Sequence, residues 1–160
     1  MAPGRPHALH SWVLAAGEGA PALPGTVASI MSHPLVTVDV RVSLDDALLA
    51  MRSLDIHHLL LLDRGRVVAV VSDRNLVRGK AAGPASRDEE HRRTRPVFQV
   101  AEYRLVTIHR DATIEEAASA MLVEGVSSLP VVDGKDEIVG IVTSRDLLRH
   151  VSGGPLRRAS

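Results

Sequence analysis

Thr143 and Asp146 are the residues best placed to bind a polar ligand, because a hydroxyl and a carboxylate stand three positions apart there. They follow an apolar, β-branched run and open a stretch with apolar side chains at helical spacing, so they occupy a strand-to-helix turn. Residues three apart lie on the same side of the first helical turn, where free backbone N–H groups bind polar or anionic groups. Together with Arg145, which could meet a phosphate, the turn predicts a ligand-binding position.

The same turn also has a purely structural interpretation. Thr143 or Ser144 would then be the N-cap of the helix, and Asp146 would be an acidic residue that the helix dipole favours in the first turn. The spacing of these residues is compatible with both interpretations.

The turn ends a unit of several elements. Apolar runs at 129–132 and 138–142 flank a polar loop and predict a β-hairpin, which the turn joins to a helix. The capping-box pattern from Thr113 to Glu116 opens another helix before the hairpin. A short strand is expected before that helix.

The unit occurs twice. Sliding the chain against itself by 70 positions pairs Leu35-Val36-Thr37 with Leu105-Val106-Thr107, and a shift of 71 pairs Arg74 with Arg145. Two divergent copies of strand-helix-strand-strand-helix therefore make up most of the chain, and we expect an α/β fold.

The first copy differs at the positions that would bind a ligand. Asn75 stands where the second copy has Asp146, and an amide can accept one hydrogen bond and donate another but lacks the charge. His57 and His58 replace two serines, and they could contact a ligand or close the site by their bulk. We expect the first site to be weakened or empty.

Composition argues against several classes of function. Only 2% of the 160 residues are aromatic, so stacking platforms for single-stranded nucleic acid are nearly excluded. Nineteen basic and nineteen acidic residues give a net charge of zero, so no global field attracts nucleic acid or an anionic membrane. The chain has no Cys, which removes disulfides, thiolate chemistry and the common zinc motifs. No stretch is long and apolar enough to span a membrane.

Other groups of reactive side chains lack residues that a metal site or a catalytic site would need. His7 and His10 are one helical turn apart but lack a third metal ligand. His57 and His58 could join His33 or His109 in a metal site, yet neighbours on a strand point to opposite faces. Ser, His and Asp occur without a Gly-x-Ser-x-Gly elbow. We therefore expect neither a metal site nor a catalytic site, and an enzyme is not expected.

Three motifs in the repeated order resemble the CBS-domain family. They are Met31-Ser-His-Pro34-Leu-Val-Thr-Val38, Leu129-Pro-Val-Val-Asp133 and Gly140-Ile-Val-Thr-Ser-Arg-Asp146. Each motif is short, but their order, duplicated at one spacing, is specific. The resemblance covers roughly residues 27 to 151 and identifies the chain as similar to a pair of CBS domains, or Bateman module.

The resemblance implies a fold and a ligand. It implies two pseudo-symmetric β-α-β-β-α repeats packed sheet to sheet, with clefts between them that bind AMP, ADP, ATP or S-adenosylmethionine as a regulatory ligand. No cofactor for a reaction is implied. In the family the Thr and Asp of the strand-to-helix turn bind the ribose hydroxyls, which here would be Thr143 and Asp146.

Further site residues follow from the resemblance. The segment around the Leu-Pro-Val-Val-Asp strand contacts the base, and the weaker cleft would use the matching positions of the first repeat. The base contacts would be Val126, Ser127, Ser128 and Pro130, and the weaker cleft would contain His57, His58, Ser72 and Asn75.

The domain organisation follows from the repeats and from composition. Residues 1–24 are expected to be a flexible tail rather than a secretory signal. CBS repeat 1 is expected at 25–79, a polar linker at 80–95, CBS repeat 2 at 96–151 and a disordered tail at 152–160.

The sequence thus predicts a small, cytoplasmic, non-catalytic regulatory protein. Its output would pass through an unknown effector protein or through a homodimer that packs by helix faces, although core packing inside the monomer also accounts for some of those faces. A scaffold with degenerate, ligand-free clefts is the alternative. A second alternative, nucleic-acid binding through Arg92, Arg93 and Arg95, is disfavoured by neighbouring acidic residues. The helix faces carry Ala47, Ala50, Met51, Ala117, Ala120 and Met121.

Overall fold

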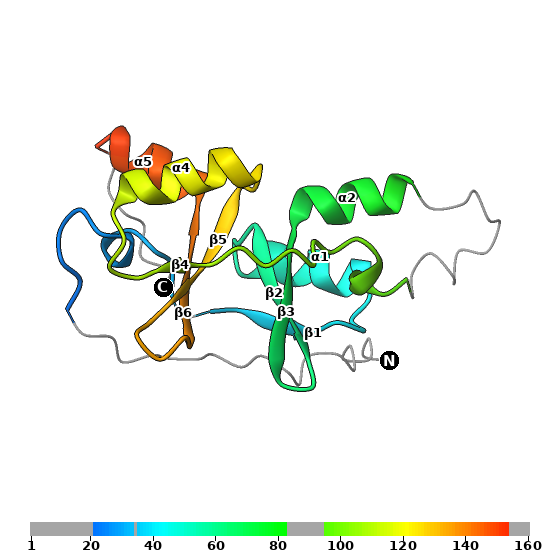
Figure 1. The fold of residues 1–160 in the computed structure, drawn as a ribbon. Helices are drawn as coiled ribbons and strands as arrows, with labels where there is room; N and C mark the ends of the chain where they lie inside the picture. Colours follow the sequence, from blue (N-terminus) through cyan, green and yellow to red (C-terminus); the bar gives the residue numbers. More distant parts are fainter. Residues whose placement is uncertain (1–20, 34, 83–94, 154–160) are drawn as a thin grey trace. The chain divides into compact units, whose positions relative to one another are not determined.

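The chain folds into two compact α/β units, each with a three-stranded sheet (Figure 1). The computed structural model describes residues 21–33, 35–82 and 95–153. Unit 1 comprises the described residues 36–82 and 95–104, and unit 2 comprises 21–33, 35 and 105–153. Each unit therefore draws on two separate stretches of the chain, and the predicted α/β class is confirmed.

Unit 1 has the predicted order of strand, helix, hairpin and helix. Strand β1 pairs with β2 in parallel, and β2 pairs with β3 antiparallel. Arg64 and Gly65 join β2 to β3 with φ values of 50° and 78°, the left-handed conformation that a two-residue hairpin turn requires. The elements are β1 (Thr37–Asp39), α1 (Leu44–Ser53), β2 (His58–Asp63), β3 (Arg66–Ser72), α2 (Asp73–Ala81) and the 3₁₀ turn η2 (Val97–Gln99).

Unit 2 repeats this order with a longer hairpin loop. Strands β4 and β5 are parallel, β5 and β6 are antiparallel, and α4 packs against α5 (Figure 1). The capping box from Thr113 to Glu116 forms as predicted, with Thr113 N donating to Glu116 Oε2 at 2.7 Å. The elements are η1 (Val27–Ser29), β4 (Ile108–His109), α4 (Ile114–Glu124), β5 (Ser128–Val132), β6 (Ile138–Thr143) and α5 (Ser144–Val151).

The segments that precede the two repeats pack on the opposite copies. We call residues 21–33 the first lead-in and residues 95–104 the second lead-in. Ser32 and Ile141 exchange backbone hydrogen bonds of 2.8 and 3.1 Å, which places the first lead-in in unit 2. Val70 and Glu102 exchange bonds of 3.3 and 3.1 Å, which places the second lead-in in unit 1. Each repeat thus receives part of its fold from the segment in front of the other repeat.

The lead-ins also contribute to the aliphatic cores. Val27, in the first lead-in, is fully buried in the core of unit 2 with Leu129 and Val142. Val97, in the second lead-in, is fully buried in the core of unit 1 with Leu59 and Val71. Since buried aliphatic groups supply most of the stabilisation of a domain, each unit needs its lead-in to complete its core.

The helix residues predicted to form a dimer face lie mainly inside the units. Five of the six side chains are at most 6% exposed, and the sixth is partly buried against the core of unit 2. The amphipathic faces of α1 and α4 are used to cover their own sheets, so the alternative of core packing accounts for these residues. The five are Ala47, Ala50, Met51, Ala117 and Met121, and the sixth is Ala120.

Several predicted segments fall outside the described residues. They are residues 1–20 of the N-terminal tail, with His7 and His10, residues 83–94 of the linker, with Arg92 and Arg93, and residues 154–160. Helix α2 continues to Ala81, into the predicted linker. Among the described ranges, no helix has both the length and the apolar character needed to cross a membrane.

Candidate functional site

Thr143 and Asp146 form a reciprocal capping box at the start of α5. Thr143 Oγ1 accepts a hydrogen bond from the Asp146 backbone N–H at 3.3 Å. Asp146 Oδ2 accepts from Thr143 N at 2.8 Å and from Thr143 Oγ1 at 2.6 Å. The structure therefore brings the two predicted residues together, and it also realises the geometry of the structural interpretation.

The second carboxylate oxygen of Asp146 is less tightly held. Asp146 Oδ1 lies 3.5 Å from Arg149 Nη1, at the limit of a hydrogen bond, although the Asp146 side chain is only 7% exposed. A buried carboxylate requires charged or polar partners, and the capping bonds meet much of that requirement. Oδ1 is consequently the oxygen that a ligand could engage without breaking the cap.

The segment predicted to contact a base lies beside this turn. Ser127 O accepts from Ser144 N at 2.9 Å, and Ser128 is the direct partner of Thr143 in the β5–β6 ladder. Pro130 is fully buried, whereas Ser127 and Arg145 are exposed. Ser127, Ser128 and Arg145 thus surround the turn. Val126, one residue earlier, is partly buried against the core of unit 2.

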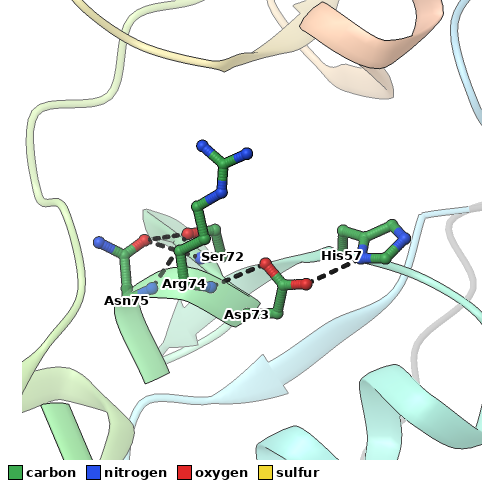
Figure 2. Close-up of polar contacts among 5 residues, drawn as sticks. All are labelled: His57, Ser72, Asp73, Arg74 and Asn75. Carbon is green, nitrogen blue, oxygen red and sulfur yellow. Dashed lines mark hydrogen bonds and ion pairs between the residues drawn. The ribbon is translucent and has the colours of Figure 1, made fainter. Parts of the chain in front are cut away.

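Unit 1 builds the same turn with an amide. Ser72 N donates to Asn75 Oδ1 at 3.0 Å, and Asn75 N donates to Ser72 Oγ at 3.2 Å (Figure 2). Asn75 Nδ2 donates to Glu102 Oε1 at 3.3 Å. Asn75 therefore forms the same cap in unit 1 as Asp146 forms in unit 2. The side-chain atom that it leaves outside the cap is a donor, Nδ2. Sequence reasoning did not identify Glu102, because no local pattern pairs it with a residue of α2.

His57 is paired with Asp73, a residue that sequence reasoning also missed. His57 Nδ1 lies 2.8 Å from Asp73 Oδ2, and Asp73 Oδ1 accepts from Arg74 N at 2.7 Å (Figure 2). Partial burial acts to raise the pKa of Asp73, but the hydrogen bonds from His57 and Arg74 outweigh it, so the net pKa lies below its usual value.

Alignment of the two repeats shows how the His57–Asp73 pair could have been found in the sequence. The shift of 71 that aligns the two strand-to-helix turns places Asp73 on Ser144 of unit 2. The backbone contact is the same in both units, because Asp73 N donates to His57 O at 3.0 Å. Unit 1 therefore carries an ionisable pair where unit 2 has serines. His58, at the start of β2, is the ladder partner of Ser72.

A metal centre finds no support in the described ranges. No group of three or more His, Cys, Asp or Glu side chains there is arranged to hold a metal ion. The histidines weighed as metal ligands, His33, His57, His58 and His109, do not form such a group within that part of the chain.

Known proteins show similarity to this chain at the level of sequence. The family model for the CBS domain matches residues 27–81 and 97–153. A CBS domain-containing protein of Dictyostelium discoideum is 32% identical over 127 residues, which are 76% of this chain and 88% of that protein. L-aspartate semialdehyde sulfurtransferase of Methanocaldococcus jannaschii is 27% identical over 128 residues, but the chain spans only 23% of its length.

Solved structures show the same similarity in three dimensions. The CBS domain pair of protein MJ0100, in complex with 5′-methylthioadenosine and S-adenosyl-L-methionine, is 25% identical with a TM-score of 0.68. That match covers 83% of this chain and 98% of the other. The cytosolic domain of the Mg²⁺ channel MgtE, in complex with ATP, is 25% identical with a TM-score of 0.60, covering 81% of this chain and 50% of the other.

The two matched segments are the two sequence repeats, and each ends in a capped strand-to-helix turn at the equivalent position. The chain therefore belongs to the CBS-domain family, with two CBS domains in tandem.

Proposed function

We propose that this chain is a non-catalytic regulatory module whose second repeat binds an adenine nucleotide or S-adenosylmethionine. The observation that carries the proposal is the Thr143–Asp146 turn, since it combines a hydroxyl with a carboxylate that keeps one oxygen outside the cap. Two similar solved structures contain adenosine compounds, 5′-methylthioadenosine with S-adenosyl-L-methionine in one and ATP in the other.

Hydrogen-bond energetics favour the turn as a ribose site. A carboxylate accepts from both vicinal hydroxyls of a ribose, and each charge-assisted bond is worth on the order of 1.5–3 kcal/mol, against about 1 kcal/mol for a neutral bond. Asp146 Oδ1 can accept these bonds because it takes no part in the cap and its 3.5 Å contact with Arg149 is at the limit of a hydrogen bond. In this proposal Thr143 and Asp146 hold the ribose, and the exposed Arg145 meets a phosphate.

The base would contact the segment that precedes and begins β5. Ser127 and Ser128 lie beside the turn through their backbone pairing with Ser144 and Thr143. Val126, which is partly buried, would supply apolar contact next to these serines, whereas Pro130 is fully buried and would support this segment without contacting the base.

The first repeat would bind more weakly. Ser72 and Asn75 reproduce the cap, but the outward atom of Asn75 is an amide nitrogen rather than a carboxylate oxygen. His57 and His58 add bulk beside the turn, and the bond of His57 to Asp73 holds its ring in place.

The signal would reach an effector protein or a second copy of the chain. Four large apolar side chains on α4 and α5 are at least 70% exposed, far more than a core residue. Helices α4 and α5 pack against each other, and we propose their exposed apolar side chains, which we call the α4–α5 patch, as a homodimer contact. The patch consists of Leu122, Val123, Leu148 and Val151.

The two rival functions have less support. Nucleic-acid binding was predicted to use three arginines, but Arg95 donates to Gln99 Oε1 and to Gly79 O, so it fastens the second lead-in to α2. A ligand-free scaffold accounts for the cap that Asp146 Oδ2 closes, but it gives no role to Oδ1, which lies outside the cap. A location in the cytoplasm remains a prediction.

Thermal unfolding of the purified protein tests the proposal. AMP, ADP, ATP and S-adenosylmethionine are added singly to the wild type, to Asp146→Ala and to Glu116→Ala. At about 100 times its Kd, a ligand should stabilise the wild type by roughly 2.7 kcal/mol. The shift should shrink in Asp146→Ala, where only the weaker first repeat could still bind.

Glu116→Ala is the matched control. Glu116 closes the capping box of α4 as Asp146 closes that of α5, so both variants lose a cap in the same unit. The ligand shift should persist in Glu116→Ala. If no ligand shifts the wild-type transition at millimolar concentration, the nucleotide proposal is wrong and the scaffold alternative takes its place.

A further inference from the structure

The two strand-to-helix turns present opposite hydrogen-bonding atoms beyond their caps. In both turns one side-chain oxygen receives the capping bonds, Oδ2 of Asp146 and Oδ1 of Asn75. The remaining atom is an acceptor, Oδ1, in Asp146 and a donor, Nδ2, in Asn75. Ribose hydroxyls that donate to Asp146 therefore find no acceptor on Asn75 itself.

A carboxylate from another part of unit 1 lies at the donor of Asn75. Asn75 Nδ2 donates to Glu102 Oε1 at 3.3 Å, and the Glu102 side chain is exposed. The backbone of Glu102 is fixed by its two hydrogen bonds with Val70 in β3. Unit 1 therefore still has a carboxylate acceptor near its turn, and this acceptor lies one hydrogen bond beyond Asn75.

Unit 2 shows the complementary arrangement. The residue that pairs with β6 as Glu102 pairs with β3 is Ser32, through its bonds with Ile141. Unit 2 therefore combines a carboxylate on the helix with a serine on the lead-in. Unit 1 combines an amide on the helix with a carboxylate on the lead-in. Apart from Asp73, which is paired with His57, each turn thus has one carboxylate at or next to its capping residue, supplied by a different segment.

We propose that Glu102 is the acceptor for the vicinal hydroxyls of a ribose in unit 1, so that the second lead-in supplies a ligand-binding residue to the first repeat. The inference rests on the proposed function, because it assigns the same ligand class to the second turn of the pair. Asn75 acts as a positioning residue that orients the Glu102 carboxylate. The ligand is recognised by its diol, so loss of its 2′-hydroxyl should weaken binding.

The test begins from Asp146→Asn. Asn75 shows that an asparagine can hold the capping box, so this variant removes the carboxylate of unit 2 without removing the cap. Calorimetric titration with AMP and with 2′-deoxy-AMP then reports on unit 1. We expect binding to remain, with AMP preferred over 2′-deoxy-AMP.

Two further variants in the Asp146→Asn background distinguish a role of Glu102 as hydrogen-bond acceptor from a purely structural role. Glu102→Ser, which copies Ser32, should weaken AMP binding about tenfold or more and abolish the preference for AMP over 2′-deoxy-AMP. Adding Asn75→Asp to Glu102→Ser copies the arrangement of unit 2 and should restore both affinity and preference. A merely structural role of Glu102 would not be rescued in this way.

The outcomes distinguish the inference from the proposed function. If the wild type binds AMP and Asp146→Asn binds none, the second-repeat site stands and the role of Glu102 is refuted. If Glu102→Ser binds AMP as tightly as its parent, or more tightly, Glu102 is not the acceptor. If the wild type responds to no ligand in thermal unfolding and binds no AMP in the calorimeter, both statements fall together.

Discussion

Met31 lies directly against Gly140. A Cβ placed on Gly140 would stand 2.5 Å from Met31 Sδ and 3.3 Å from Ser32 O. In unit 1 the matching positions are Ala101 in the lead-in and Ala69 in β3, and both belong to or pack on the core of that unit. A large side chain over a glycine in one unit thus corresponds to two alanines in the other. The lead-in side chain at this position is therefore matched in size to the corresponding strand residue in each unit.

Gly140→Ala should destabilise the protein. The new methyl would overlap Met31 and approach the backbone of the first lead-in, and overpacking of this kind typically costs about 1–3 kcal/mol. Chemical denaturation should show a lower midpoint with an unchanged slope. In the Met31→Ala background the same change should cost less, because the overlapping sulfur is gone.

Gly134→Ala is the control for Gly140→Ala. A Cβ at Gly134, in the β5–β6 loop, meets nothing within 4 Å. Its free energy of unfolding should change by no more than about 0.5 kcal/mol. Equal losses at the two glycines would show that steric contact with Met31 is not the cause.

Gly79→Ala should also destabilise, against the trend of helix propensity. Alanine is favoured over glycine inside a helix by about 1 kcal/mol. However, a Cβ at Gly79 would lie 2.3 Å from Val100 Cγ1, and the second lead-in would have to move away from α2. Since the overpacking cost of about 1–3 kcal/mol exceeds the gain, the melting temperature should fall. Val100→Ala in the same protein should recover part of the loss, and a stabilised Gly79→Ala single variant would contradict the contact.

Asp73→Asn should reduce stability in a pH-dependent way. The folded pKa of Asp73 lies below its usual value, so the carboxylate contributes stability above the unfolded pKa of about 3.9, and this contribution is lost as pH falls through the folded value. Because the side chain is 40% exposed, solvent screening limits the effect to below about 1 kcal/mol. Urea midpoints of wild type and variant should differ at pH 6, and the difference should shrink as pH falls below the unfolded pKa and through the lower folded pKa.

His57→Ala identifies the partner responsible. The His57 hydrogen bond is the first of the interactions that lower the pKa of Asp73. In the His57→Ala background, Asp73→Asn should therefore change the midpoint less at pH 6. An unchanged difference would assign the effect to the Arg74 backbone bond instead.

A charge in the α4–α5 patch should disrupt self-association. Leu148→Arg places a charge where a dimer would bury an apolar side chain, and burying an unpaired charge is costly. Light scattering should give the mass of a dimer for the wild type and of a monomer for the variant.

The control for this variant places a charge elsewhere in unit 2. Gly134→Glu lies in the loop between β5 and β6, at the end of these strands away from α4 and α5, and should leave the mass unchanged. A monomeric wild type, or loss of the dimer in both variants, would refute the patch as the contact.

Local signals in the sequence sufficed for most elements and for the second-repeat turn. The apolar runs around 133–137 predicted β5 and β6. The capping-box pattern at Thr113 predicted where α4 begins, and the hydroxyl residue at the end of the second apolar run predicted where α5 begins. Ser43 caps α1 through the bond from Asp46 N to its hydroxyl, but its hydroxyl donates to Asp46 Oδ2, whereas in a full capping box the Ser43 N–H would donate. These features depend on residues a few positions apart, which a sequence pattern can represent.

Contacts between segments that are far apart in the chain could not be predicted from the sequence. The lead-in motif around Met31 was recognised, but nothing local shows that it packs on Gly140. The bond from Asn75 to Glu102 depends on the same exchange of lead-ins. Likewise, helical spacing shows that Ala47 and Met51 share an apolar face, but it does not show what covers that face.

The exchange of lead-ins bears on how such a chain can be inherited and recombined. A gene segment that encoded one repeat with its own lead-in would lack the surface on which that lead-in packs, because this surface belongs to the other repeat. Recombination within the pair would separate Met31 from Gly140, or Val100 from Gly79. The smallest transferable module is consequently the pair. Substitutions in one half are therefore constrained by residues encoded in the other.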